Sequence, residues 1–354
     1  MDAPGGLLPP PRGARARRSV LSVPASNPRF VARAALTEAD AVLFDLEDSV
    51  APARKPATRG AIVRALNETD FGGKLRVVRI NALPTPWAVR DVVDLVEGAG
   101  ANLDAIVLPK ADRPEDVSAL DVMLSSLEAQ AGLAPGGIAI EAQIETAAGM
   151  ASVERIAGAS PRLETLVFGP GDYAASIGMP LLAIGAVDAP HAPDAPDAPD
   201  GAPAYPGHLW HFAIQRIVVA AKAAGLQAIN GPYGRFRDLP GLRRAAILDY
   251  TLGMDGKWAV HPTQVPVLNE AFTPPPDQVA QAEAILARYR RAVEEEGLGA
   301  VAMGEEMIDE ASRRLAEALL RRPGVRRAGS RERAPGAGRE PEDERERERD
   351  RLTD

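Results

Sequence analysis

The chain of 354 residues contains no cysteine and only four histidines. The lack of cysteine excludes disulfide bonds, thiol nucleophiles and zinc sites built on cysteine. No run approaches the roughly 18 apolar residues that a membrane-spanning helix needs, so we expect no membrane span. The formal net charge of −8 argues against generic binding to nucleic acid. We take the cytoplasm as the default location.

An apolar fraction of 45% is ample for a sizeable core. Three segments lack apolar patterning, and we expect them to be unstructured because they can bury little. Residues 1–17 are rich in proline, glycine and arginine, and residues 186–206 contain repeated Ala-Pro-Asp. Residues 323–354 end in alternating glutamate and arginine.

Between these segments, short apolar runs typical of strands alternate with helix-like segments. The strand candidates are residues 19–23, 41–46, 75–80, 105–108, 138–144, 165–168, 227–230 and 257–260. Helices are expected over residues 28–36, 56–66, 87–97, 114–128, 147–156, 210–224 and 239–252. Eight strands alternating with helices predict an α/β fold, a (β/α)₈ TIM barrel over residues 18–272, better than an open sheet. No Gly-x-Gly-x-x-Gly motif opens a helix after the first strand, which weakens the dinucleotide-binding alternative.

Two more helices are expected after the eighth strand, over residues 277–296 and 306–320. Residues 273–322 therefore form a C-terminal helical extension. It either closes the barrel or reaches a neighbouring subunit.

Two acids stand at the carboxyl ends of consecutive predicted strands. Glu145 follows the apolar run 138–144, and Asp172 follows the run 165–168. Ligands of parallel α/β sheets and barrels bind at this edge. Two carboxylates there, in a chain without cysteine, predict an oxygen-ligand site for a hard cation, most plausibly Mg²⁺.

Three further acids, Asp45, Glu47 and Asp48, end the second predicted strand. Asp45 and Glu47 share one face because a strand alternates its faces. Capping acids of a loop before a helix would look the same. Beside Glu145 and Asp172, they are a plausible support that holds metal-bound water or orients an arginine.

Arg79 and Lys110 end the third and fourth predicted strands. The planar fork of Arg79 suits bidentate capture of a substrate carboxylate, and pairing with Asp45 and Glu47 is equally compatible with the sequence. Lys110 invites an aldolase interpretation through a Schiff base. Acidic surroundings would keep its amine protonated, so we favour a structural or electrostatic role.

Two features at other strand ends carry weaker signals. His261, before a proline at the end of the eighth strand, could position a substrate or be an ordinary core residue. Gly171, in Gly-Pro-Gly before Asp172, permits close approach of the backbone to a ligand, although such turns are common.

Ordered motifs along the chain resemble one known family. They are Ser-Val-Pro-Ala-Ser-Asn-Pro (22–28), Phe-Asp-Leu-Glu-Asp-Ser-Val (44–50), Arg-Ile-Asn (79–81), Leu-Pro-Lys (108–110), Ile-Glu-Thr-Ala-Ala-Gly (144–149), Gly-Pro-Gly-Asp-Tyr-Ala-Ala-Ser-Ile-Gly (169–178), Gly-Lys-Trp-Ala-Val-His-Pro (256–262) and Met-Ile-Asp (307–309). The set is similar to the HpcH/HpaI aldolase and citrate lyase beta-subunit-like superfamily, over about residues 18–320. Within it, the malyl-CoA/β-methylmalyl-CoA lyases are the most similar.

The resemblance implies a TIM barrel that assembles as a homotrimer or homohexamer and uses Mg²⁺ or Mn²⁺. It implies that Glu145 and Asp172 bind the metal and that Arg79 binds the substrate. Asp309 matches an aspartate that the C-terminal extension inserts into a neighbour's site, where it would act as the catalytic base. The positions that line the substrate or coenzyme A match Ser22, Val23, Asn27, Gly171, Asp172, Val260 and His261.

The implied reaction is the reversible, metal-dependent cleavage of malyl-CoA or β-methylmalyl-CoA to glyoxylate and acetyl-CoA or propionyl-CoA. A citramalyl-CoA or citryl-type lyase and a malyl-CoA thioesterase remain open on the same site, as does a non-catalytic scaffold subunit. The chain departs from the family at Asn230 and Arg235, which replace aspartates, and at Asn27, where some members have arginine. Gly304-Glu305-Glu306 and the Ala-Pro-Asp insert depart from it too.

Overall fold

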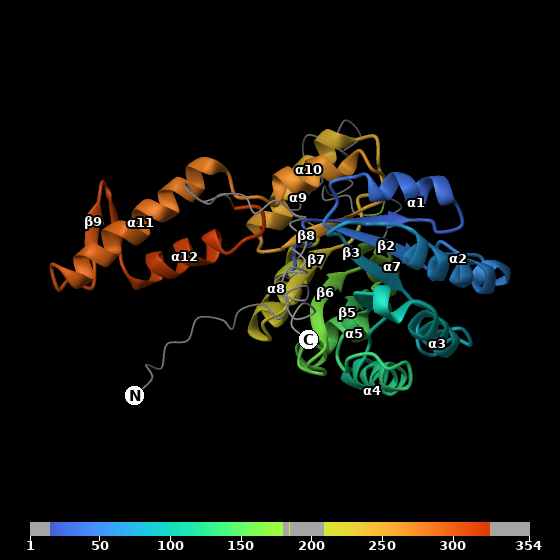
Figure 1. The fold of residues 1–354 in the computed structure, drawn as a ribbon. Helices are drawn as coiled ribbons and strands as arrows, with labels where there is room; N and C mark the ends of the chain where they lie inside the picture. The colour runs from blue at the N-terminus through green and yellow to red at the C-terminus, as the bar shows by residue number, and fades with distance from the viewer. Residues whose placement is uncertain (1–14, 180–183, 185–208, 326–354) are drawn as a thin grey trace, which may run out of the picture.

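The computed structural model describes residues 15–179, 184 and 209–325, and eight parallel strands close into a barrel at its centre (Figure 1). The strands are β1 Ser19–Val23, β2 Ala41–Asp45, β3 Leu75–Arg79, β4 Ala105–Leu108, β5 Ala139–Ile144, β6 Leu163–Phe168, β7 Gln227–Asn230 and β8 Gly256–Ala259. Each pairs in parallel with the next, and β1 pairs with β8 to complete the ring. The predicted TIM barrel is confirmed.

Helices surround the barrel, between successive strands and after β8 (Figure 1). They are α1 Pro28–Ala35, α2 Lys55–Glu68, α3 Ala88–Ala99, α4 Pro114–Gln130, α5 Ala147–Ala151, α6 Val153–Ala157, α7 Pro170–Ser176, α8 His211–Ala223, α9 Leu239–Thr251 and α10 Gln264–Ala271, with short 3₁₀ turns at Pro52–Arg54 and Gly100–Asn102. None of the helices in the described ranges is long and apolar enough to cross a membrane.

The strands are buried on both faces, which explains their nearly continuous apolar runs. One apolar cluster lies between the strands and the helices. A second fills the barrel interior with small and branched side chains, as TIM barrels require. This interior cluster consists of Val20, Ala41, Leu43, Leu75, Val77, Ala105, Val107, Ala139, Val167, Ile229 and Trp258.

Three local predictions need correction. The helix expected over 147–156 is two helices, because Ser152 leaves the helical conformation at φ −112° and ψ 5°. The sequence predictions omitted α7, whose Gly-Pro-Gly start looked like a turn. There Pro170 occupies the first helical position, where a missing N–H costs nothing. They also omitted α10.

The C-terminal extension projects from the barrel as an arm made of α11 Pro276–Glu294, the hairpin β9 Val301–Met303 and β10 Glu306–Ile308, and α12 Glu310–Leu320 (Figure 1). The helix predicted from residue 306 is wrong at its start. Gly304 has φ +63° and makes the tight turn between β9 and β10, so the chain stays extended until Asp309.

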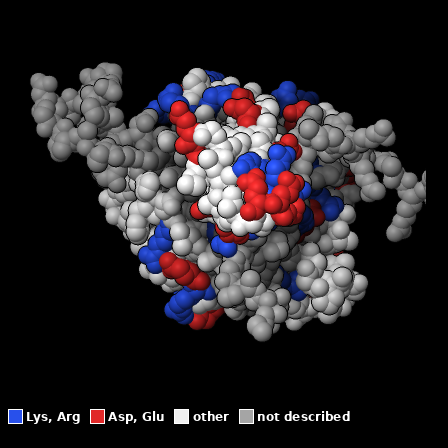
Figure 2. Space-filling view, turned by 90° about the vertical axis from the view of Figure 1, so that its left-hand side faces the viewer, with Lys and Arg blue, Asp and Glu red and all other residues white. Residues whose placement is uncertain are grey.

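The arm has two small apolar clusters of its own. Val279, Ala282, Ala316 and Leu320 pack α11 against α12 near the barrel, and Ala292, Val301 and Ile308 pack the hairpin against α11 at the other end. On the face that carries the arm, acidic and basic side chains lie side by side (Figure 2). Exposed ion pairs of this kind contribute little each, so the apolar clusters hold the arm together.

Asp309 lies at the end of the arm that is remote from the barrel. The opposite end of α12 returns to the barrel, where the Arg322 guanidinium lies 4.3 Å from the Tyr250 ring centroid and donates to the Met254 carbonyl at 3.2 Å. The 11 residues of α12 span roughly 16 Å at the usual helical rise. Asp309 is therefore separated from its own barrel by the length of this helix.

The prediction that residues 1–17 are unstructured is wrong for the last three of them. Arg17 is fully buried at the amino-terminal end of the barrel, where it binds Glu141 at 2.8 Å, Gln227 at 2.8 Å and Glu164. Arg15 pairs with Glu164 as well. The sequence of this proline- and glycine-rich segment predicts that its charged side chains are solvated. The structure instead pairs Arg15 and Arg17 with acidic residues of the strands. The insert 186–206 and the tail from residue 326 lie outside the described residues.

Candidate active site

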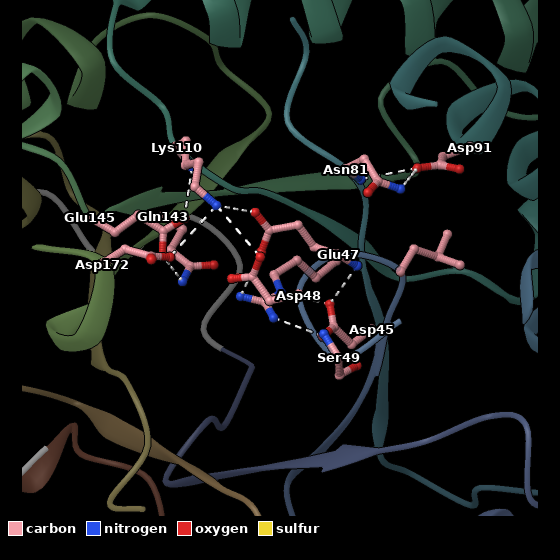
Figure 3. A network of polar contacts seen from close by, with 12 residues as sticks. Asp45, Glu47, Asp48, Ser49, Asn81, Asp91, Lys110, Gln143, Glu145 and Asp172 are labelled. Atoms are coloured by element: carbon pink, nitrogen blue, oxygen red, sulfur yellow. Dashed lines mark hydrogen bonds and ion pairs between the residues drawn. The ribbon is translucent and has the colours of Figure 1, made fainter. Parts of the chain in front are cut away.

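Glu145 and Asp172 meet at the carboxyl-terminal rim of the barrel, as predicted. Glu145 directly follows β5, and Asp172 lies in the first turn of α7 after β6. Figure 3 shows the two acids side by side, with Lys110 next to both. The backbone N–H of Lys110 donates to Glu145 Oε1 at 2.9 Å, and its ammonium lies 3.6 Å from Asp172 Oδ2.

The Glu145 carboxylate is almost completely buried and has one donor on each oxygen. Besides the Lys110 N–H on Oε1, the Gln143 side chain donates to Oε2 at 2.5 Å. Burial, together with the negative charges of Glu47 and Asp172, raises the pKa of Glu145 to about 8. A divalent cation between Glu145 and Asp172 would relieve this repulsion.

Lys110 has a left-handed backbone, with φ +49°. A non-glycine residue rarely adopts this conformation, and such strain is concentrated at functional sites. Its ammonium contacts Glu47 and lies 3.8 Å from Asp48. Burial alone would lower the pKa of Lys110, but Glu47, Glu145 and Asp172 raise it above the ordinary value. The amine is therefore protonated and unsuited to forming a Schiff base.

Arg79 is fixed by the acids of the preceding strand end. It donates to both oxygens of Asp45 at 2.7 Å and lies 3.1 Å from Glu47 Oε2, an ion pair without hydrogen-bond geometry. Burial disfavours the charged form of Asp45, but the hydrogen bonds and charge of Arg79 lower its pKa to about 2. The guanidinium also lies 5.5 Å from the Trp258 ring centroid inside the barrel. Arg79 is thus held rigidly at the rim.

A cavity of about 210 Å³ opens between the ends of β1 and β8. Four of the residues expected to contact a ligand line it: Ser22, Val23, Val260 and His261. The His261 ring stacks on Phe236, with centroids 5.2 Å apart. Phe30 and Arg33 of α1 complete the wall, so the cavity is mostly apolar with one cationic edge.

Three other predicted residues do not line this cavity or the acid cluster. Asn27 caps α1 by accepting from Arg29 N at 3.1 Å. Gly171 lies within α7, where an added Cβ would meet Ile184 at an ordinary 3.5 Å. Asp309 caps α12 at the tip of the arm and is exposed there, so a single chain does not bring it to Glu145.

Comparison with known proteins gives the family. The model of the HpcH/HpaI aldolase/citrate lyase family matches residues 18–262. The chain is 41% identical to L-malyl-CoA/beta-methylmalyl-CoA lyase of Rhodobacter capsulatus, over 88% of this chain and 96% of that protein. It is 34% identical to malyl-CoA/beta-methylmalyl-CoA/citramalyl-CoA lyase of Chloroflexus aurantiacus, over 80% of each. The chain belongs to the HpcH/HpaI aldolase/citrate lyase family.

A solved structure supports the same assignment. CitE of Mycobacterium tuberculosis, in complex with magnesium, acetoacetate and coenzyme A, matches with a TM-score of 0.65 and 28% identity, over 88% of this chain and all of that one. Members of the HpcH/HpaI aldolase/citrate lyase family are enzymes, so the prediction of an enzyme is confirmed.

Two departures from the family lie outside the acid cluster. Asn230 points to the outer side of the barrel, where it donates to Asp249 Oδ1 at 2.8 Å. Asp249 also pairs with the buried Lys257 at 3.0 Å. Arg235 is exposed in the loop before α9. Neither residue touches Glu145 or Asp172.

The donor set suits a magnesium-type ion. Among the described residues, no group of three or more His, Cys, Asp or Glu is arranged to enclose a metal. Two carboxylates are nevertheless enough for Mg²⁺, which usually keeps several waters and binds through one or two carboxylates plus the substrate. Glu145 keeps free lone pairs on both oxygens after its two hydrogen bonds.

The sequence predictions missed two residues that contact the rim cluster. Gln143 of β5 lies two residues before Glu145 and donates to it, and the ring of Trp258, a residue of β8, lies against the Arg79 guanidinium. The signal for Gln143 was present, because a polar residue two positions before an acid on a buried strand shares its face. Trp258 looked like an ordinary aromatic core residue.

Proposed function

We propose that this enzyme reversibly cleaves the carbon–carbon bond of L-malyl-CoA, of β-methylmalyl-CoA, or of both. The products would be glyoxylate and acetyl-CoA or propionyl-CoA. The observation that carries the proposal is the rim cluster, in which Arg79 and Lys110 stand beside Glu145 and Asp172. The names and identities of the two curated relatives support this choice of substrate.

Glu145 and Asp172 would hold Mg²⁺ or Mn²⁺, which supplies Lewis-acid stabilisation of the oxygens of a two-carbon oxo acid when bound. Arg79 carries a fixed positive charge at the same rim. Because Asp45 holds its guanidinium in place, Arg79 can stabilise an oxyanion without reorganising during the reaction. Lys110 adds a second cationic group that stays protonated.

Cleavage needs a base that removes the hydroxyl proton of the malyl group. The hydroxyl carbon then becomes the aldehyde of glyoxylate, and the electrons of the broken bond pass to the α-carbon of the acyl-CoA as an enolate. Protonation of that enolate gives acetyl-CoA. In the direction of condensation, Asp309 would take the α-proton of acetyl-CoA.

We propose that Asp309 acts on a neighbouring subunit, in a homotrimer or homohexamer. The arm formed by residues 273–322 holds Asp309 away from its own barrel, and its tip is exposed. The cavity lined by Ser22 and His261 would take part of the coenzyme A, with its apolar wall and the cationic edge of Arg33.

The deciding experiment measures glyoxylate and acetyl-CoA formed from malyl-CoA, with and without Mg²⁺. We expect turnover that EDTA abolishes and Mg²⁺ restores. Glu145→Ala and Asp172→Ala should each eliminate it. Metal-independent turnover, or an unchanged response to EDTA in either variant, would count against the site.

A citramalyl-CoA lyase is the second candidate, because one curated relative carries that activity in its name. Offering glyoxylate or pyruvate as the acceptor for acetyl-CoA separates the two lyases. Release of free CoA from malyl-CoA without glyoxylate would identify a thioesterase instead. A scaffold subunit would turn over none of these substrates.

A further inference from the structure

Gln143 is a buried polar residue whose side chain lies inside the barrel. Only 3% of it is exposed, and its register partner on β6 is Val167. Glu141 and Gln143 of β5 and Glu145, the residue directly after β5, occupy three successive inward positions, because alternate residues of a strand share a face. Glu141 binds Arg17 at the barrel floor, and Glu145 stands at the rim. Gln143 lies between these two acids along the chain, and its hydrogen bond goes to Glu145.

The amide of Gln143 is only half satisfied. Its Nε2 donates to Glu145 Oε2 at 2.5 Å, whereas its buried Oε1 has no hydrogen-bond partner among the described residues. A buried polar atom without a partner destabilises the folded protein, because it loses its hydrogen bonds to water and gains none in return. An apolar residue such as the neighbouring valine would avoid this cost, so the amide has a use that packing alone does not provide.

The chemistry of the Gln143 amide suits one use, which is to orient a carboxylate that binds a cation. A carboxylate that is to bind a cation needs a donor that fixes its orientation without neutralising its charge. Lysine or arginine would pair with Glu145 and compete with the cation. Glutamine donates a hydrogen bond and adds no charge.

The backbone around Gln143 fits this use. Gly169 leaves room for both side chains, since an added Cβ would come within 2.5 Å of Glu145 Oε2 and 3.0 Å of Gln143 Nε2. Lys110 N holds the other oxygen, Oε1, at 2.9 Å. The Glu145 carboxylate is therefore clamped from two sides, with the remaining lone pairs free.

We propose that Gln143 is a positioning residue that fixes the Glu145 carboxylate for the divalent cation. The inference rests on the proposed function, in which Glu145 binds that cation. Supporting hydrogen bonds behind metal ligands typically change metal affinity 10- to 100-fold. In this role Gln143 acts through Glu145, to which its amide donates.

The test is Mn²⁺ binding, followed by the EPR signal of free Mn²⁺ in titrations of purified protein without substrate. Gln143→Met keeps the volume but removes the donor, and we expect its Kd for Mn²⁺ to rise about 10- to 100-fold. Saturating metal should restore most of kcat, because the metal site is weakened rather than removed. Thr165→Val on the neighbouring β6 is the matched control. It removes a buried hydroxyl that, like the Gln143 amide oxygen, has no hydrogen-bond partner among the described residues, and the variant should bind Mn²⁺ within about twofold of wild type.

A Gln143→Met protein with native circular dichroism and wild-type Mn²⁺ affinity would overturn the inference. If Gln143→Met does not fold, Gln143→Asn provides the same comparison, since its shorter amide cannot reach Oε2. Failure of the wild type itself to bind Mn²⁺ would overturn the proposed function together with this inference. If the wild type binds Mn²⁺ and the folded Gln143 variant binds it with the same affinity, only the inference about Gln143 is overturned.

Discussion

Gly169 lies directly against Glu145: a Cβ on residue 169 would come within 2.5 Å of both Cβ and Oε2 of that glutamate. Real side chains do not approach so closely, so any other residue at 169 would displace the carboxylate. Glycine is therefore required at residue 169 because the Glu145 side chain leaves no room for a Cβ. The backbone conformation does not require it, since any residue can adopt its φ of −101°.

Gly169→Ala should therefore impair the enzyme without unfolding it. A displacement of about 1 Å at a reacting group can cost 10²-fold in rate, and we expect a loss of about that size in kcat/KM. The overpacked core should also lose about 1–3 kcal/mol of stability, visible in the urea midpoint. Gly60→Ala in α2, where the new Cβ meets only Arg64 at 3.7 Å, is the control. Equal kcat/KM for the two variants would contradict the proposed role of Glu145.

Asp309 combines a structural contact with its proposed chemical role, and two variants separate them. Its carboxylate caps α12 by accepting from Ala311 N and Ser312 N. Asparagine caps a helix as well as aspartate does but cannot act as a base. Asp309→Asn should therefore keep its stability and metal binding while turnover falls about 10²- to 10⁴-fold. Asp309→Ala should in addition lower the urea midpoint, because the helix cap is lost. Normal turnover in Asp309→Asn would remove it from the reaction.

Mixing two inactive chains tests whether the sites are shared between subunits. Asp309→Asn chains keep Glu145, and Glu145→Ala chains keep Asp309. If each site takes Asp309 from a neighbour in a ring, random co-assembly restores about one site in four. Activity that stays absent after co-refolding, in assemblies shown by ultracentrifugation to be mixed, would contradict the exchange.

The barrel could be predicted from sequence because its strands are buried on both faces and appear as apolar runs. Every predicted strand overlaps an observed one, and the ranges 19–23, 105–108 and 227–230 match fully. The helix ends were less regular, because Ser152 and Gly304 interrupt the pattern through single backbone conformations. Such interruptions depend on tertiary packing, which the 3.6-residue spacing of apolar residues along a helix does not reveal.

The acid cluster could be predicted in outline because strand ends of a parallel barrel converge. The sequence placed Glu145, Asp172, Arg79 and Lys110 at such ends, and the structure brings them together. It could not reveal the left-handed backbone of Lys110 or the missing partner of Gln143 Oε1, since both arise from contacts between strands. Nor could it reveal the burial of Arg17, whose partners lie more than 120 residues away.

Asp45 should make stability depend on pH in the acidic range. Burial alone would raise the pKa of Asp45, but the hydrogen bonds and charge of Arg79 outweigh it and lower the pKa from 3.8 in the unfolded chain to about 2 in the folded protein. A lowered pKa contributes stability that is complete above the unfolded value and is lost as pH falls toward the folded one, here about 2 kcal/mol. Asp45→Asn should therefore be less stable than wild type at pH 7, with the difference in urea midpoint shrinking between about pH 4 and pH 2. A difference that stays constant over this range would contradict the ion pair.

Arg17 at the barrel floor should matter more for stability than any exposed arginine. Removing one partner of a buried ion pair leaves the other charge uncompensated and typically costs 3–5 kcal/mol. Arg17→Met would leave the buried Glu141 in that state, and we expect a loss of about this size in the free energy of unfolding. Arg15→Met is the matched control, because Arg15 is about one-third exposed and its loss should cost about 1 kcal/mol or less. Replacing Glu141 by methionine in the Arg17→Met background should recover much of the stability, since the unpaired charge is then gone. A double variant no more stable than Arg17→Met would show that Arg17 acts through packing rather than through its charge.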